Sequence, residues 1–211
     1  MKLTDRVHRI EATRGSHAYL VLGDEPMLID TGLPGRGDRI LAELASHGLR
    51  PGDLAHILLT HHDIDHIGNA RFLQEATGAT LWAPKDDLPF IEGTCRRPGL
   101  KGLADAIVKV NPPRGLRTFE AGQRIGDLEI IPTPGHTPGH TSLRLDDMLF
   151  AGDLIGSAKG KLRMISTLLV WDAQALRNSL EEVGKLSFDW VFPAHGDPVR
   201  RGGMWEALLK S

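Results

Sequence analysis

Residues 60 to 66 read Thr60-His61-His62-Asp63-Ile64-Asp65-His66, so three histidines and two aspartates share one short segment. The segment follows directly on Ala-His-Ile-Leu-Leu-Thr (55–60), a short apolar run that predicts a buried strand. Imidazole and carboxylate groups are the ligands of Zn, Fe and Mn sites, and a loop at a strand end is held in place by the rigid scaffold. The segment therefore indicates a metal-binding loop, against the alternative of a polar turn with incidental histidines.

Three further segments farther along the chain show the same arrangement of a metal-ligand residue after a strand. They are Thr133-Pro-Gly-His136-Thr-Pro-Gly-His140, Phe150-Ala-Gly-Asp153 and Pro193-Ala-His195-Gly-Asp197. Each places a histidine or an aspartate directly after a β-like run. We therefore expect these side chains to converge with the first segment on one edge of the sheets.

The rest of the chain divides into short strands and helices. Apolar patterns and Gly or Asp turns predict strands over 7–13, 17–23, 26–32, 55–60, 79–84, 116–122, 124–134, 140–147, 148–153 and 188–196. Helical spacing predicts helices over 36–47, 69–77, 100–110, 173–186 and 204–210. The first three strands suggest an antiparallel opening. Two similar halves, each a sheet with helices on its outer face, predict an α/β (α+β) four-layer sandwich forming a single domain over residues 1–211.

The ordered motifs resemble those of the metallo-β-lactamase superfamily across almost the whole chain. The matching residues are Asp30 in Leu28-Ile-Asp-Thr-Gly32, the cluster from His61 to His66, His136, Asp153 and His195. The resemblance implies an αβ/βα sandwich with a two-metal site between its sheets. It further implies that one metal takes His61, Asp63 and His136. The other metal would take Asp65, His66 and His195, and Asp153 would bridge the pair.

Asp63 departs from the family pattern, which is His-x-His-x-Asp-His. His62 is an alternative ligand, but it is offset by one residue and is expected to point away from the site. A carboxylate is a harder ligand than imidazole and widens the metal preference from Zn toward Fe or Mn. Asp63, Asp65, Asp153 and a bridging hydroxide would balance two divalent ions, so we expect activity to rise at a higher pH than in an Asp63→His variant.

Two residues are expected to support the ligands, and two to act in catalysis. The resemblance implies that Asp30 accepts an N–H from a ligating histidine, which would fix that ring's tautomer. His140 either faces the cleft or supports a ligand. Asp65 and Asp153 are the candidates for proton movement and metal bridging in catalysis. His8, His47 and His56 lie outside every motif and are expected to be structural.

These residues favour a metal-dependent hydrolase that cleaves an ester-like bond, in a thioester or a lactone before a phosphodiester. No Gly-x-Ser-x-Gly motif is present, so no serine nucleophile is implied. The alternative is an iron-dependent oxidoreductase that handles oxygen or sulfur in the same pocket. The substrate-binding residues are not identified by any motif, but segments 85–114 and 156–171 are expected to form the cleft walls.

The amino-acid composition of the chain limits which binding partners and which cellular compartment are expected. The 211 residues carry a formal net charge of −2, which gives no electrostatic argument for nucleic acid or an anionic membrane. The start, Met-Lys-Leu-Thr-Asp-Arg-Val, lacks the apolar stretch of a secretory signal, and the single cysteine, Cys95, fits a reducing compartment. We therefore expect a cytoplasmic enzyme with a small-molecule substrate, with a homodimer as the default assembly.

Overall fold

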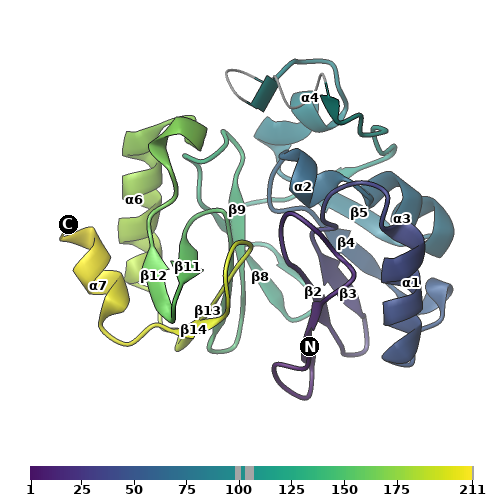
Figure 1. Ribbon diagram of the computed structural model, residues 1–211, viewed down its shortest axis with the longest axis horizontal. Coiled ribbons are helices and arrows are strands. Elements are labelled where there is room, and N and C mark those ends of the chain that lie inside the picture. The colour runs from purple at the N-terminus through teal and green to yellow at the C-terminus, as the bar shows by residue number, and fades with distance from the viewer. Residues whose placement is uncertain (98–100, 103–106, 211) are drawn as a thin grey trace. The chain divides into compact units, whose positions relative to one another are not determined.

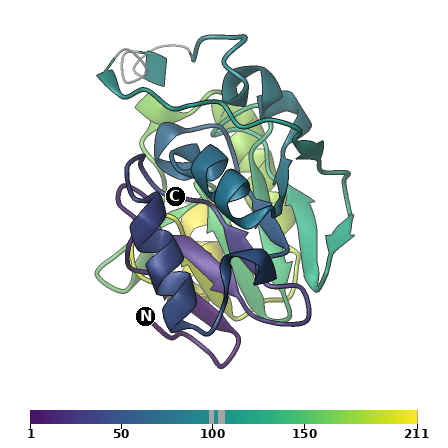
Figure 2. The same cartoon turned by 90° about the vertical axis from the view of Figure 1, so that its right-hand side faces the viewer.

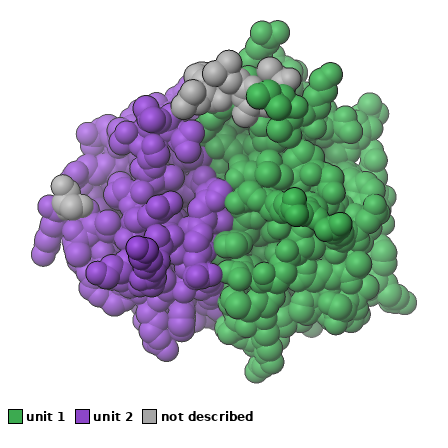
Figure 3. All heavy atoms as spheres, viewed as in Figure 1, with its two compact units in different colours: residues 1–118 green, residues 119–211 purple. Residues whose placement is uncertain are grey.

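The computed structural model describes residues 1–97, 101–102 and 107–210. The chain divides into two compact units, unit 1 over residues 1–118 and unit 2 over residues 119–211, coloured separately in Figure 3. Each unit is described by itself below. The single domain expected over 1–211 stays a prediction.

Unit 1 is built on a six-stranded mixed sheet with the order β1-β2-β3-β4-β5-β6. The first three strands are antiparallel and the next three continue in parallel from β3. Their bounds are β1 (Val7–Ile10), β2 (Ala18–Val21), β3 (Met27–Ile29), β4 (His56–Leu58), β5 (Thr80–Ala83) and β6 (Arg117–Thr118). The parallel strands β3 and β4 end side by side, with Ile29 paired to Leu58, and their following loops therefore leave from the same edge of the sheet.

Helices α1 (Gly37–Ser46) and α3 (Ala70–Thr77) cover the sheet of unit 1, as Figures 1 and 2 show. Their apolar stripes include Ile40, Leu44 and Leu73, which pack with strand residues such as Leu28 and Ile57 in one buried cluster. The shorter helical turns are η1 (Pro51–Asp53), α2 (Ile64–Ile67), η2 (Lys85–Asp87) and α4 (Leu88–Ile91). Burial of these stripes holds the edge of the sheet from which the histidine cluster projects.

Unit 2 also contains a six-stranded mixed sheet, with the order β14-β13-β10-β9-β8-β7. All neighbouring strands are antiparallel except β10 and β13, which run parallel. The bounds are β7 (Arg124–Ile125), β8 (Leu128–Pro132), β9 (Thr141–Leu145), β10 (Met148–Gly152), β13 (Trp190–Pro193) and β14 (Val199–Arg200). A separate hairpin pairs β11 (Gly156–Ala158) with β12 (Lys161–Arg163), followed by the turn η3 (Thr167–Leu169).

Helices α6 (Ala173–Gly184) and α7 (Met204–Leu209) complete unit 2. Leu176, Leu180 and Val183 of α6 pack with Leu149 and Val191 of the sheet. Asp172 caps the N-terminus of helix α6, and its carboxylate accepts the N–H groups of the residues two and three positions later. Within the described ranges, no helix is long and apolar enough to cross a membrane.

The α/β class with two mixed sheets, and the antiparallel opening, are confirmed. The sequence pattern was wrong in three places. The segment 116–122 contributes only β6, which pairs in parallel with β5. The segment 124–134 forms two strands, because Gly126, with φ of 51°, turns the chain between them. Asp65 and His66 lie on the one-turn helix α2 instead of a loop. The helix expected over 100–110 lies partly outside the described residues; of the described part, residues 101, 102 and 107 are helical and residues 108–110 are not.

Candidate functional site

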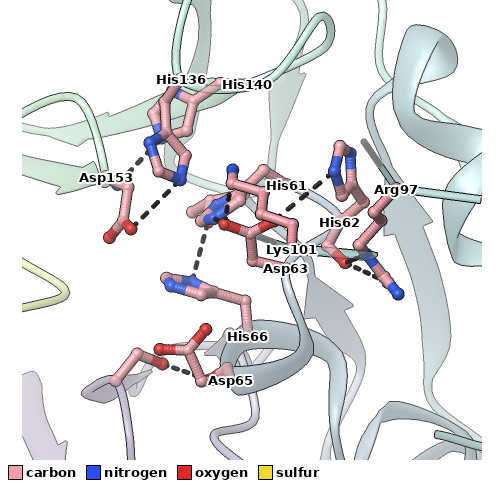
Figure 4. Close-up of polar contacts among 12 residues, drawn as sticks. His61, His62, Asp63, Asp65, His66, Arg97, Lys101, His136, His140 and Asp153 are labelled. Atoms are coloured by element: carbon pink, nitrogen blue, oxygen red, sulfur yellow. Dashed lines mark hydrogen bonds and ion pairs between the residues drawn. The ribbon is translucent and has the colours of Figure 1, made fainter. Parts of the chain in front are cut away.

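The metal-ligand types of unit 1 gather where β3 and β4 end (Figure 4). We call His61, Asp63, Asp65 and His66 the His61 cluster. His61 and His66 are fully buried, with ring centroids 3.9 Å apart, while Asp63 and Asp65 are half-buried. Each of these four side chains belongs to a group whose ligand atoms lie close enough together to hold a metal ion. The neighbouring His62 belongs to neither group.

Asp30 organises the His61 cluster from the end of β3. Its Oδ1 accepts the backbone N–H of Thr60, and its Oδ2 accepts the Thr60 hydroxyl, both at 2.8 Å. The same Oδ2 lies 2.8 Å from Nδ1 of His66. Asp30 has φ of 59°, a left-handed conformation that aspartate tolerates better than most residues. The carboxylate is 2% exposed, so these bonds form away from solvent.

The hydrogen bonds fix the tautomers of both histidine rings. A carboxylate only accepts, so the Nδ1 of His66 carries the proton that it shares with Asp30. The Thr60 hydroxyl donates to Asp30 and therefore accepts from Nδ1 of His61, which is 2.9 Å away. Both rings consequently keep Nε2 as the unprotonated ligand atom, the arrangement found behind metal-bound histidines. Asp30 orients His66 directly and His61 through Thr60.

The spacing within the cluster fits a tetrahedral metal. The Nε2 of His61 lies 3.4 Å from Oδ2 of Asp63. Bonds of about 2.1 Å at a tetrahedral angle would place two ligand atoms about 3.4 Å apart. Lys101 also contacts Asp63, with its Nζ 2.7 Å from the same Oδ2. No sequence motif marks Lys101, which lies in the segment 85–114.

Gly15 permits the close packing behind Asp65. Its φ is 84°, and a Cβ on it would lie 2.6 Å from the Cβ of Asp65. Ser16 next to it donates its hydroxyl to the backbone carbonyl of Asp65. The loop between β1 and β2 thus supports the helix turn α2 that carries Asp65 and His66.

His62 contacts two aspartates of unit 1, since its Nε2 lies 3.5 Å from Oδ1 of Asp63 and its other ring nitrogen faces Asp87. Its Nδ1 lies 3.0 Å from Oδ2 of Asp87, which also accepts the His62 backbone N–H at 2.8 Å. The His62 ring packs on Phe90, with centroids 4.5 Å apart, and Arg97 donates to the His62 carbonyl. Asp87 is fully buried. Asp87 follows the end of β5, as Asp30 follows the end of β3. This position after a strand is the feature of the sequence that could have identified it.

The metal-ligand types of unit 2 are His136, Asp153 and His195, which we call the Asp153 cluster. The two oxygens of Asp153 face different histidines: Oδ2 lies 3.3 Å from Nε2 of His136, and Oδ1 lies 3.4 Å from Nε2 of His195. Both distances match the ligand spacing of a tetrahedral metal, about 3.4 Å. Each oxygen of the Asp153 carboxylate therefore faces a different histidine at that spacing.

His140 and the start of α6 hold the Asp153 cluster. The Nε2 of His140 accepts the backbone N–H of Asp153 at 2.9 Å, so its Nδ1 carries the proton and faces Thr133, 2.8 Å from Oγ1. Gly135, with φ of 138°, lets the loop approach α6, because a Cβ there would lie 2.2 Å from the Leu176 backbone nitrogen. His140 is thus placed behind the cluster, supporting the backbone of Asp153.

A cavity of about 470 Å³ opens beside the Asp153 cluster within unit 2. Its lining consists of Asp153, Ile155, Gly156, Arg163, Met164, Ile165, Ser166, Leu169 and His195. Met164 and Leu169 are 42% and 39% exposed. The lining belongs largely to the segment 156–171, which the sequence analysis expected to form a cleft wall. The lining combines polar side chains, among them Asp153, Arg163 and His195, with apolar ones.

Three histidines that lie outside both clusters are His8, His47 and His56. His8 stacks on His47, with ring centroids 4.2 Å apart, and burial together with the neighbouring His47 holds the pKa of His8 below its usual value. His56 receives the indole N–H of Trp82 at 3.3 Å, and burial lowers its pKa as well. A lowered pKa favours the neutral ring in the folded protein.

Comparisons with known proteins identify the family of the chain. A family model for the metallo-beta-lactamase superfamily matches residues 12–195. The probable metallo-hydrolase MJ0888 of Methanocaldococcus jannaschii is 31% identical over 191 residues, covering 86% of this chain and 88% of the relative. A hydroxyacylglutathione hydrolase of Shewanella baltica is 32% identical over 145 residues, covering 67% of this chain and 48% of the relative, so the match spans about half of that protein.

Solved structures show the same likeness. The structure described as TTHA1623 in a di-iron-bound form has a TM-score of 0.74 and 31% identity, covering 91% of this chain and 92% of the other. The Rm3 metallo-beta-lactamase has a TM-score of 0.71 and 26% identity, covering 92% and 77%. The fold, the donor set and these matches place the chain, as an enzyme, in the metallo-β-lactamase superfamily of metallo-hydrolases.

Proposed function

We propose that the His61 and Asp153 clusters together hold two divalent metal ions and hydrolyse an ester-like bond, a thioester or a lactone. The observation that carries the proposal is Asp153, whose two oxygens face Nε2 of His136 and Nε2 of His195. In this assignment His61, Asp63 and His136 would hold one ion. Asp65, His66 and His195 would hold the other, and Asp153 would be shared by the two.

The bound ions would polarise the substrate carbonyl and activate a water molecule near neutral pH. The chain's own residues supply the remaining functions. Asp30 and Thr60 keep the Nε2 atoms of His61 and His66 unprotonated and aimed in fixed directions. Asp65 is the carboxylate proposed to move the proton from the attacking water to the leaving group.

The cavity beside Asp153 is the proposed seat of the acyl group. Its lining combines the polar Asp153, Arg163 and His195 with a wall of apolar side chains that includes Met164 and Leu169. An acyl chain on that wall would place its carbonyl near the metal-ligand side chains and displace water from them. Thioesters are favoured further by the relative named hydroxyacylglutathione hydrolase, and the substrate of this chain is proposed from that likeness and from the cavity together.

The metal identity is proposed as Zn or Fe. The relative solved in a di-iron-bound form supports iron, and Asp63 adds a hard oxygen ligand that iron accepts as well as zinc does. Iron in the site would also suit the alternative function, an oxidoreductase for oxygen or sulfur compounds. Metal analysis and an absorption spectrum of the purified protein separate the two functions, since a hydrolase needs no redox-active ion.

The test is a hydrolysis screen of acyl thioesters, lactones and phosphodiesters with Zn-, Mn- and Fe-loaded protein. We expect turnover of a thioester or a lactone with two ions per chain, and loss of that turnover in Asp153→Asn. Protein that binds two ions and cleaves neither class would refute the proposal. Consumption of oxygen by the iron-loaded protein alone would favour the oxidoreductase.

A further inference from the structure

Lys101 contacts the one ligand position at which this chain departs from its family. Its Nζ lies 2.7 Å from Oδ2 of Asp63, and both side chains are only 14% exposed. The Nε2 of His61 lies 3.4 Å from that same oxygen. Figure 4 shows Lys101, His61 and Asp63 grouped in this way. The ammonium group is therefore bound to the oxygen that would share a metal ion with His61.

The ion pair between Lys101 and Asp63 restores the net charge that the ligand set would have with a neutral histidine in place of Asp63. The family pattern has a neutral histidine where this chain has Asp63, so the carboxylate adds one negative charge to the ligand set. Lys101 adds one positive charge at hydrogen-bond distance, which makes the Asp63–Lys101 pair neutral as a whole. Low exposure strengthens the effect, because charges shielded from water are weakly screened.

We propose that Lys101 is the charge partner of Asp63, and that the pair together replaces the neutral histidine of the family pattern. A carboxylate oxygen has two lone pairs, so Oδ2 of Asp63 can accept the Lys101 ammonium and still offer an electron pair on the side of His61. The proposal rests on the proposed two-metal function. It assigns to Lys101 a positioning and electrostatic role that acts through Asp63.

The role predicts opposite effects on metal binding and on turnover. In Lys101→Met, the loss of a nearby cation should tighten the binding of Zn²⁺ by about tenfold or more, because like charges no longer repel. Turnover should fall at the same time, since a less positive site stabilises the negative charge of the transition state less. Damage to the local structure would instead weaken both properties.

The experiment is a Zn²⁺ titration against a chromophoric chelator, with thermal midpoints measured to verify folding. Lys101→Arg keeps the charge and is expected to stay near the wild type. Lys85→Met is the matched control, because Lys85 is an exposed lysine of the same unit in η2. Binding by Lys101→Met that is equal to or weaker than that of the wild type overturns the proposal.

The same substitution of Lys101 can also be tested in the Asp63→His variant, so that the conclusion does not depend on one variant alone. Asp63→His should bind Zn²⁺ more weakly than the wild type, because Lys101 then faces a neutral ring beside the ions. Adding Lys101→Met to Asp63→His should restore binding to near the wild-type level. A double variant no tighter than Asp63→His overturns the proposal. If the Lys101 effects appear but no ester-like substrate is cleaved, the charge pairing stands and the hydrolase function fails.

Discussion

The two clusters present ligands of similar kind but are built in different ways. In unit 1, the His61 cluster comes from one continuous stretch, and a buried carboxylate, Asp30, supports its histidines. In unit 2, the Asp153 cluster draws on three separate loops, and a neutral histidine, His140, supports it through the backbone of Asp153. A charged support acts on ring orientation and basicity, whereas a neutral support acts mainly on loop position. Substitutions in the two units should therefore differ in kind as well as in size.

The largest effect is expected at Asp153, whose carboxylate faces both histidines of the Asp153 cluster. Asp153→Asn keeps the shape but replaces one oxygen ligand by an amide and removes the charge. We expect kcat/KM to fall by about a thousandfold or more, since the proposed bridging of two ions is lost. The measurements are steady-state kinetics and metal content per chain. The control is Asp147→Asn, an exposed aspartate in the turn before β10. A variant that retained full metal content and activity would contradict the bridging role.

The next effect tests the charged support of unit 1. Asp30→Asn suits the left-handed backbone at this position, because asparagine also tolerates positive φ. The amide cannot match the carboxylate as an acceptor for both Thr60 and His66, so metal affinity should fall by about 10- to 100-fold. Metal titration measures this loss. Unchanged affinity together with a lower thermal midpoint would mean that Asp30 is needed only for folding.

A smaller and different effect is expected at the neutral support of unit 2. His140→Leu leaves the buried N–H of Asp153 without its acceptor, which should cost about 1–3 kcal/mol in the free energy of unfolding. Denaturant unfolding measures the loss, and His140→Gln, which offers a replacement acceptor, should recover part of it. If His140→Leu reduced metal affinity as strongly as Asp30→Asn does, the contrast between the two supports would break down.

The smallest effect concerns acid stability and lies outside both clusters. The pKa of His8 is lowered in the folded protein, so the unfolded chain binds this proton more readily. The native protein is therefore unaffected above the unfolded pKa of about 6.5 and loses stability as the pH falls below it. His8→Gln should show a smaller drop in thermal midpoint between pH 7.5 and pH 5.5 than the wild type. Equal drops in the two proteins would mean that other groups set the acid sensitivity.

Much of the fold could be predicted because local patterns coincide with real elements. The apolar run before Thr60 does contain β4, and the helical spacing of Ile40 and Leu44 does fall on α1. The local sequence pattern did not predict strands whose formation depends on pairing with a distant strand. Strand β6 has only two residues, and its place beside β5 follows from contacts between distant parts of the chain. The hairpin of β11 and β12 is also short and lacks an apolar alternation that would have marked it.

The sequence by itself determined the donor types, since side-chain chemistry and strand-end position are both written in it. His61, Asp63, Asp65, His66, His136, Asp153 and His195 could all be named from motifs. Only the tertiary structure decided which polar groups support or balance them. The hydrogen bond from His66 to Asp30, the pairing of His62 with Asp87 and the ion pair of Lys101 with Asp63 each join residues far apart in the chain. Such contacts depend on distances and orientations in space, for which a linear pattern carries no signal.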